Sequence, residues 1–188
     1  VTGRPLIEAY GLTETSPAAC MNPLTLPAFN AKIGLPISST IVKILDDEGN
    51  DLPVGENGEL AIKGPQVMKE YWNRPEDTAN VMTADGFFKT GDIAFMDEEG
   101  YFKIVDRKKD MILVSGFNVY PNEVEDVAVT HPNISEAAAI GIPNEKSGEI
   151  VKLFIVKKGE ITSEEVIAHC RTSLTGYKIP KIIEFRDD

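Results

Sequence analysis

The pattern of apolar residues changes near Asp106, and this change constrains the fold more than any other feature of the chain. From Thr40 to Asp106, short apolar runs are separated by clusters of Gly, Asp and Asn, as is typical of strands joined by turns. Such a pattern favours a small, distorted β-barrel or a sandwich. The elements predicted here are strands at 41–45 and 58–64, a short helix at 75–82 and a hairpin over 95–102.

Beyond Asp106, strands and helices alternate over about 80 residues, which indicates a compact α+β domain. Thr162 and Glu165 have the spacing of a capping box at a helix start, and Pro121 suits the first turn of an earlier helix. The charged run 106–110 is the expected joint between the two parts. The predicted elements are strands at 111–114, 137–142, 151–156 and 179–185, and helices at 121–131 and from Thr162 to about Leu174.

The two ends of the chain indicate a piece of a longer protein. Residues 1–36 are rich in Gly, Pro and Thr, and we expect loops that join short elements there. The chain starts with Val1 rather than Met, and it stops at Asp188 just after an apolar, strand-like run. We therefore expect a longer parent protein on both sides.

Charge and apolar content exclude several functional classes. Lys and Arg number 19 against 30 Asp and Glu, which gives the 188-residue chain a net charge of −11 and makes nucleic acid a poor partner. No apolar run approaches the roughly 18–20 residues of a membrane span, and no secretory signal is visible, so we expect a cytoplasmic protein.

The cysteines and histidines show no metal-ligand spacing. Cys20 and Cys170 are far apart and belong to no CxxC pattern, so we expect buried thiols in a reducing compartment, with a distant disulfide left open. His131 and His169 are expected in helical contexts, as satisfied or exposed side chains.

The segment Tyr10-Gly11-Leu12-Thr13-Glu14-Thr15 is the first candidate for chemistry. A Tyr ring can stack on a base, while Gly11 permits close approach of the backbone. Thr13 can bind a phosphate oxygen, and the Glu14 carboxylate suits Mg²⁺. The alternative is an ordinary capped turn.

Three further segments carry polar groups at turns or joints. Asp92, presented by Thr90-Gly91, could grip ribose hydroxyls or be a solvated hairpin residue. Arg107, next to Asp106, could reach a ribose or phosphate or belong to a solvated charged linker. Ser115-Gly116-Phe117-Asn118-Val119-Tyr120-Pro121 places Gly116 between a strand and a helix, which suits a tight turn or the passage of a ligand.

The order and spacing of these segments resemble the adenylate-forming enzyme superfamily, the AMP-dependent synthetases and ligases. The resemblance covers essentially the whole chain and also includes Gly58-Glu59-Leu60, Tyr71-Trp72 and Leu174-Thr175-Gly176-Tyr177-Lys178-Ile179-Pro180. The run Val105-Asp106-Arg107-Lys108-Lys109-Asp110 is most similar to bacterial long-chain fatty-acid–CoA ligases. Peptide synthetases usually carry Pro at the position of Leu12, and luciferases carry Lys at the position of Leu113. Both differences favour the acyl-CoA branch.

The resemblance implies an α+β fold, with a distorted β-barrel portion followed by a small α+β C-terminal lid domain. Residues 1–105 would be the end of the large domain, including the tail of its α/β subdomain, and 106–188 the lid, truncated before its catalytic lysine. The implied catalytic residues are Thr13, Glu14 and Gly116. For the nucleotide, the implied binding residues are Tyr10 on adenine, Asp92 and Arg107 on ribose, Thr13 at the α-phosphate, and Gly11. Glu14 would bind Mg²⁺. Ser115 and Gly116 would line the pantetheine passage, and Asp106 would be the hinge.

The reaction implied for the parent is activation of a fatty acid by ATP, followed by transfer from acyl-AMP to coenzyme A. Because the family's phosphate-binding loop should lie upstream of Val1, the chain alone is expected to be inactive. Two alternatives remain: a carrier-protein or amine acceptor in place of CoA, and a nucleotide-binding module without chemistry. Self-association of the chain and peripheral membrane contact of the parent are further expectations.

Overall fold

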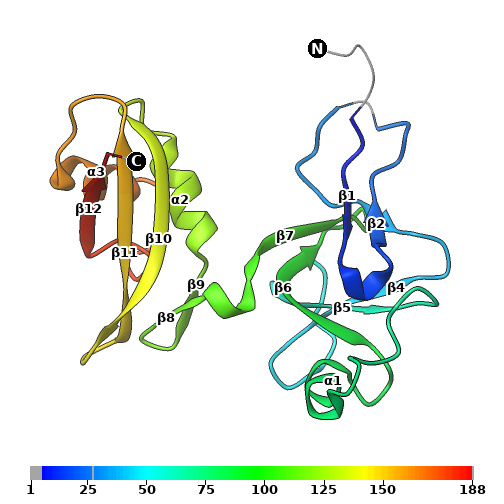
Figure 1. Cartoon of the computed structure of the whole chain (residues 1–188). Coiled ribbons are helices and arrows are strands. Elements are labelled where there is room, and N and C mark those ends of the chain that lie inside the picture. Colours follow the sequence, from blue (N-terminus) through cyan, green and yellow to red (C-terminus); the bar gives the residue numbers. More distant parts are fainter. Residues whose placement is uncertain (1–5, 27, 188) are drawn as a thin grey trace. The chain divides into compact units, whose positions relative to one another are not determined.

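The computed structural model describes residues 6–26 and 28–187, which form two compact units, one ending at Val105 and one beginning at Asp106. Figure 1 colours the first unit from blue to green and the second from green to red. Each unit has its own buried apolar cluster. The mixed α+β class is confirmed. The described strands form open sheets, so the barrel portion is not closed by strand pairing.

The first unit combines a four-stranded sheet with a smaller three-stranded one (Figure 1). Leu60, Ile62 and Phe102 from the larger sheet share one apolar cluster with Ala19 and Cys20 from the smaller sheet. The larger sheet has the order β4 (Ile41–Leu45), β5 (Gly58–Lys63), β6 (Phe88–Met96), β7 (Phe102–Arg107); the smaller has β1 (Ala9–Gly11), β2 (Ala18–Met21), β3 (Leu35–Pro36); α1 (Pro75–Val81) precedes β6.

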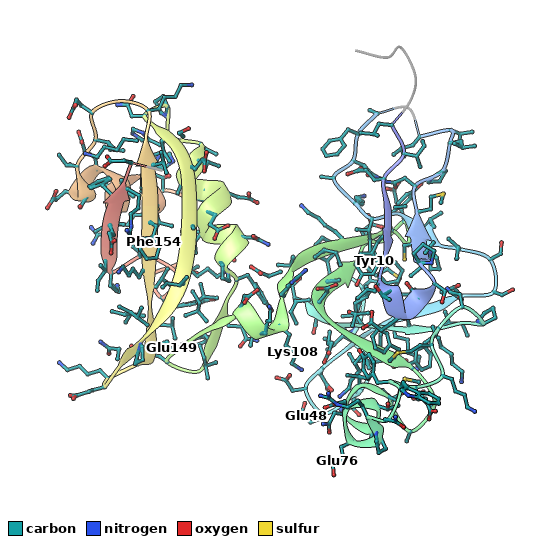
Figure 2. The ribbon with its side chains drawn as sticks, viewed as in Figure 1. Tyr10, Glu48, Glu76, Lys108, Glu149 and Phe154 are labelled. Atoms are coloured by element: carbon teal, nitrogen blue, oxygen red, sulfur yellow. The ribbon has the colours of Figure 1, made fainter. Side chains whose placement is uncertain are left out.

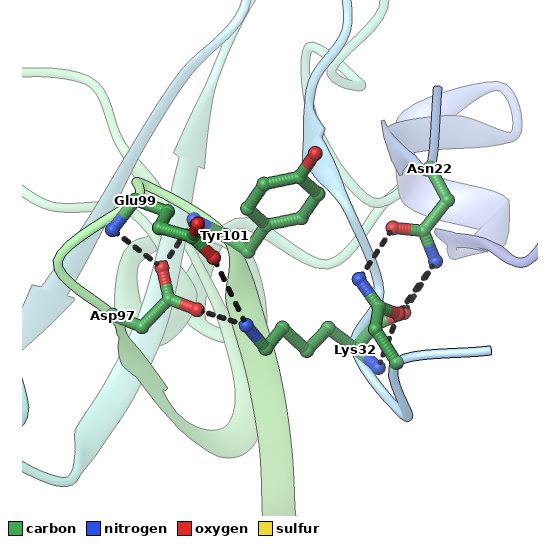
Figure 3. A network of polar contacts seen from close by, with 6 residues as sticks. Asn22, Lys32, Asp97, Glu99 and Tyr101 are labelled. Carbon is green, nitrogen blue, oxygen red and sulfur yellow. Dashed lines mark hydrogen bonds and ion pairs between the residues drawn. The ribbon is translucent and has the colours of Figure 1, made fainter. Parts of the chain in front are cut away.

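A polar network joins the loop before β3 to the turn between β6 and β7 (Figure 3). Lys32 pairs with Asp97 and lies 3.8 Å from Glu99. Asp97 Oδ1 also accepts the backbone N–H groups of Glu99 and Tyr101, each at 2.9 Å. One carboxylate therefore orders the turn and ties it to a segment 65 positions away.

The second unit is a mixed sheet with two helices on one face. Val151, Leu153 and Ile155 of the central strand face these helices and are fully or almost fully buried. The sheet order is β10 (Ile134–Asn144), β11 (Gly148–Lys157), β8 (Ile112–Val114), β9 (Phe117–Val119), with β12 (Ile182–Arg186) parallel to β11; the helices are α2 (Pro121–Val129) and α3 (Ser163–Cys170).

Local signals predict the starts of helices better than their ends. The Thr162–Glu165 capping box is confirmed: Thr162 Oγ1 accepts the Glu165 N–H at 3.3 Å, and the Glu165 carboxylate accepts the Thr162 N–H at 2.9 Å. The predicted ends at residues 131 and 174 are too late, because the chain turns after Val129 and after Cys170.

Two expectations about strands have different outcomes. Short elements joined by loops are found in residues 1–36 as expected, since the elements described there include β1, β2 and β3. Strand β10 extends over eleven residues and is longer than the predicted strand 137–142, because its ladder with β11 continues past the apolar run to the pair Asn144–Gly148.

None of the described helices has the length and apolar content needed to cross a membrane.

Candidate functional site

The turn between β1 and β2 is built by close backbone packing at Gly11. A Cβ atom there would lie 1.7 Å from the Pro17 carbonyl oxygen, so the site accepts only glycine without rearrangement. Thr15 is fully buried; its hydroxyl accepts the Leu12 N–H at 2.9 Å and donates to the Pro17 carbonyl at 2.5 Å. These bonds fix the 3-10 turn Thr13–Thr15 and leave Thr13 exposed.

Tyr10 contacts Asp92, which lies 82 positions away along the chain. The Tyr10 hydroxyl donates to Asp92 Oδ2 at 2.5 Å. Tyr10 lies on β1 and is labelled in Figure 2. Burial, followed by the bond to the Asp92 carboxylate, raises the pKa of the Tyr10 phenol well above its ordinary value. The phenol is therefore a proton donor to Asp92 throughout the neutral range.

A β-bulge in β6 places Asp92 at this position. Thr90, Gly91 and Asp92 lie opposite Leu60 alone in the β5–β6 ladder, so the strand bends there. Gly91 has a positive φ of 76°, and the Thr90 hydroxyl accepts the Asp92 N–H at 3.1 Å. Asp92 is thus a half-buried residue of strand β6, whereas the alternative from the sequence was a solvated hairpin residue.

Glu14 is held by a segment that precedes α1. The Tyr71 hydroxyl donates to Glu14 Oε1 at 2.8 Å, and the Met68 N–H donates to the Glu14 carbonyl at 2.7 Å. Burial and the bond to the Glu14 carboxylate raise the pKa of Tyr71 to about 12. Sequence reasoning gave Tyr71 no role, because no local pattern links it to a residue 57 positions earlier.

The arrangement suits a metal ion that is shared with a phosphate ligand. Among the described residues, no three His, Cys, Asp or Glu side chains gather closely enough to hold a metal by themselves. Mg²⁺ is commonly held by one or two carboxylates together with substrate phosphates. Glu14, a half-buried carboxylate with one oxygen already hydrogen-bonded, fits such a site.

Asp106 begins the second unit and caps α2. It is 6% exposed; its two carboxylate oxygens accept the N–H groups of Arg107 at 2.7 Å and Asn122 at 2.9 Å. Because Asn122 lies in the first turn of α2, the carboxylate satisfies a donor that the helix leaves free. The adjoining Arg107 side chain is exposed at the end of β7.

Asp106 also lines a groove of about 390 Å³ in the second unit. Four carboxylates and one lysine face the groove, so it does not favour an anionic ligand. Its charged lining residues are Asp106, Lys109, Asp110, Glu125 and Glu149.

Ser115 and Gly116 form the two-residue turn between β8 and β9. Both have positive φ, 53° and 85°, as a type I′ hairpin turn requires. Both are exposed, and the Ser115 N–H donates to the Ser147 carbonyl at 2.7 Å. The turn is thus fixed at its base and open at its tip.

The predicted site residues therefore fall into two groups. In the first unit, Tyr10 is bonded to Asp92, and the adjacent segment contains Gly11, Thr13 and Glu14. The second unit contains the remaining residues, which are Asp106, Arg107, Ser115 and Gly116.

Both cysteines are free and buried, which confirms the expectation of buried thiols. Burial raises the pKa of Cys20 to about 12.

Two models of one family match the two parts of the chain. Residues 1–72 match the AMP-binding enzyme model, and residues 123–188 match the AMP-binding enzyme C-terminal domain. The chain belongs to the AMP-binding enzyme family. The resemblance inferred from the motifs is thereby confirmed at the level of the family.

Individual members of the AMP-binding family are similar over the whole chain. It is 57% identical to a long-chain-fatty-acid–CoA ligase of Yersinia pestis and spans 34% of that protein's length. The structure of ATP-bound MatB from Rhodopseudomonas palustris matches with a TM-score of 0.93 and a sequence identity of 36%; the match covers 100% of this chain and 38% of the MatB chain. The structure of the amide bond synthetase McbA from Marinactinospora thermotolerans matches with a TM-score of 0.87 and a sequence identity of 33%; the match covers 100% of this chain and 38% of the McbA chain.

Proposed function

We propose that this chain is part of an AMP-forming long-chain fatty-acid–CoA ligase. The observation that carries the proposal is the 57% identity, across the whole chain, to a ligase of that name. Because the chain spans about a third of that relative, the activity is proposed for the complete protein. The chain alone is expected to be inactive, without the upstream phosphate-binding loop and the lysine beyond Asp188 that the family resemblance implies.

In this proposal the first unit binds the nucleotide. The ring of Tyr10 stacks on adenine, and Asp92 holds the ribose hydroxyls. Arg107, which belongs to the second unit, is proposed as a further ribose-binding residue. Thr13 contacts the α-phosphate, and the Glu14 carboxylate holds Mg²⁺, which neutralises phosphate charge. Support comes from the bond between Tyr10 and Asp92, and from the ordered turn that exposes Thr13.

The proposed chemistry has two balanced steps. A fatty carboxylate oxygen attacks the α-phosphorus of ATP, and pyrophosphate leaves with the electron pair of the broken P–O bond. The CoA thiolate then attacks the acyl carbonyl carbon, and AMP leaves as the thioester forms. The residues of this chain contribute position and charge complementarity to these steps.

For the second unit we propose a lid role. Residues 1–105 would end the large domain, and residues 106–188 would form most of the lid, with Asp106 as the hinge between the two half-reactions. Ser115 and Gly116 would line the passage of the CoA thiol. The exposed tip of their turn supports this role, since no neighbouring atom lies within 4 Å of a Cβ built on Gly116.

The test is carboxylate-dependent ATP–pyrophosphate exchange by the complete protein, with fatty acids of several lengths beside a set of amino acids. We expect exchange with long fatty acids and, on addition of CoA, formation of a thioester. Exchange with amino acids alone would contradict the proposal. Absence of any exchange would instead support the alternative of a nucleotide-binding module without chemistry.

A second acceptor class has a specific observation in its favour. The similarity to McbA, an amide bond synthetase, leaves an amine as the alternative to the CoA thiol. Supplying CoA, an acyl carrier protein and simple amines in parallel to the fatty-acid-charged enzyme separates these acceptors. We expect CoA to be used, given the higher identity to the CoA ligase. A cytoplasmic location, with peripheral membrane contact of the parent, belongs to the same proposal.

A further inference from the structure

Tyr71 contacts the one carboxylate of the Tyr10–Thr15 segment. Its hydroxyl donates to Glu14 Oε1 at 2.8 Å, while the Met68 N–H donates to the Glu14 carbonyl at 2.7 Å. A single segment therefore holds both the main chain and the side chain of Glu14. Within the described part of the chain, the second carboxylate oxygen makes no hydrogen bond, so it is available to a ligand.

The position of Tyr71 is itself fixed by the start of α1. The Tyr71 N–H donates to Thr78 Oγ1 at 2.9 Å, and its carbonyl accepts the Arg74 N–H at 3.1 Å. The Thr78 hydroxyl in turn donates to the Arg74 carbonyl at 2.9 Å. The phenol is thus supported by an ordered turn and a helix, so its hydroxyl can define a direction for the carboxylate.

A second anchor ties the same segment to the β1–β2 turn. Gln66 Nε2 donates to the Ala18 carbonyl at 3.2 Å and to Thr40 Oγ1 at 2.8 Å. Gln66, Met68 and Tyr71 together provide three bonds from residues 66–71 to residues 14–18. The contact with Glu14 is therefore part of a built interface rather than a chance approach of two surface side chains.

We propose that Tyr71 is a positioning residue that orients the Glu14 carboxylate toward a metal ion bound with a nucleotide. The inference rests on the proposed function, in which Glu14 holds Mg²⁺. A carboxylate with one oxygen fixed by a neutral donor presents its other oxygen in a defined direction, which lowers the cost of ordering it on binding. Outer partners of this kind commonly change metal affinity by about 10–100-fold.

The experiment measures Mn²⁺ binding by electron paramagnetic resonance, on the complete protein in the presence of α,β-methylene-ATP. Tyr71→Phe should weaken Mn²⁺ binding about tenfold. Binding of AMP without metal should stay within about twofold of wild type, because the phenol acts through Glu14 and not on the base or ribose. Tyr101→Phe, which removes the hydroxyl of another half-buried tyrosine in the first unit, is the matched control and should change neither quantity.

A double-mutant cycle separates positioning from general stabilisation. In a Glu14→Gln background, Tyr71→Phe should cause no further loss of Mn²⁺ affinity, since the group through which it acts is gone. Additive losses would overturn the inference, and so would an unchanged Mn²⁺ affinity in Tyr71→Phe. If Tyr71→Phe does not fold, Thr78→Val takes its place, because it removes the acceptor of the Tyr71 N–H. Thr78→Val should also weaken Mn²⁺ binding, and an unchanged Mn²⁺ affinity in this variant would overturn the inference.

The measurement on wild type distinguishes failure of the proposed function from failure of the role of Tyr71 alone. If the wild-type protein binds neither AMP nor Mn²⁺ with the ATP analogue, the proposed function and the role of Tyr71 both fail. If wild type binds both and Tyr71→Phe binds Mn²⁺ equally well, only the role of Tyr71 fails.

Discussion

At the scale of single residues, packing and hydrogen bonds inside the β1–β2 turn hold the candidate site in place. Gly11 permits the Pro17 carbonyl to approach the β1 backbone, and the buried Thr15 hydroxyl bonds across the turn. Removing a buried hydroxyl that bonds the main chain leaves an N–H and a carbonyl without partners, which typically costs about 1–3 kcal/mol. The exposed Thr13 therefore derives its position from two neighbours inside the turn.

Gly11→Ala should destabilise the first unit, because the new Cβ would lie 1.7 Å from the Pro17 carbonyl oxygen. We expect a loss of about 1–3 kcal/mol in the free energy of unfolding, as for other overpacked sites. Urea unfolding followed by circular dichroism measures it. Gly176→Ala is the control, since a Cβ there meets no atom within 4 Å; equal stability of the two variants would contradict the packing argument.

At the scale of elements, one carboxylate defines the start of α2. Asp106 precedes the helix by many residues, yet its Oδ2 accepts the Asn122 N–H in the first turn. The helix has Pro121 at its first position and no side-chain cap from Tyr120. Asp106 therefore supplies the cap that the adjacent residues do not, and it joins the start of the second unit to that helix.

Asp106→Ala should loosen the first turn of α2. Loss of a helix cap typically costs about 0.5–2 kcal/mol, and hydrogen exchange of the α2 amides should accelerate accordingly. Asp126→Ala, at an exposed position in the middle of α2, is the matched control and should leave the first turn protected. Unchanged exchange at Asn122 in Asp106→Ala would show that the carboxylate does not cap the helix.

Glu125, also on α2, should make the stability of the second unit depend on pH. Burial raises the pKa of its carboxyl, as do the nearby charges of Asp106 and Asp126, although the Ala139 N–H donates to it at 2.7 Å and acts in the opposite direction. A raised pKa in the folded state means that folding retains a proton, so stability falls as pH rises through the range between the unfolded and folded pKa values.

Glu125→Gln removes that charge and keeps an oxygen that can accept the Ala139 N–H. The stability of the variant relative to wild type should therefore increase from about pH 4 to pH 7, the window that begins at the ordinary carboxyl pKa. Urea unfolding at several pH values measures the difference. A difference that stays constant or falls with pH would contradict the environment described for Glu125.

How much the sequence could predict depended on whether the determining contacts were local. The Thr162–Glu165 capping box is spread over four residues and was predicted correctly. Tyr71 was missed because its role is visible only once residues 57 positions apart are brought together. The Thr90–Asp92 segment was recognised as a turn, but its place in a strand follows from the pairing of β6 with Leu60 of β5, which no local pattern reveals.

At the scale of the whole molecule, two compact units divide the candidate residues between them. The first contributes the base- and phosphate-facing residues of the proposal, and the second contributes Asp106, Ser115 and Gly116. The proposed two-step reaction would use residues of both units, with different groups acting in its two halves. The central claim is therefore that the Tyr10–Asp92 pair, joined by a 2.5 Å hydrogen bond, binds the nucleoside of ATP.

The most direct test is fatty-acid-dependent ATP–pyrophosphate exchange by the complete protein carrying Asp92→Asn, beside Asp47→Asn in the exposed turn after β4. Loss of charge-assisted bonds to two ribose hydroxyls should raise the KM for ATP at least about tenfold in Asp92→Asn. Asp47→Asn should match wild type. A KM for ATP within about twofold of wild type in Asp92→Asn would contradict the account.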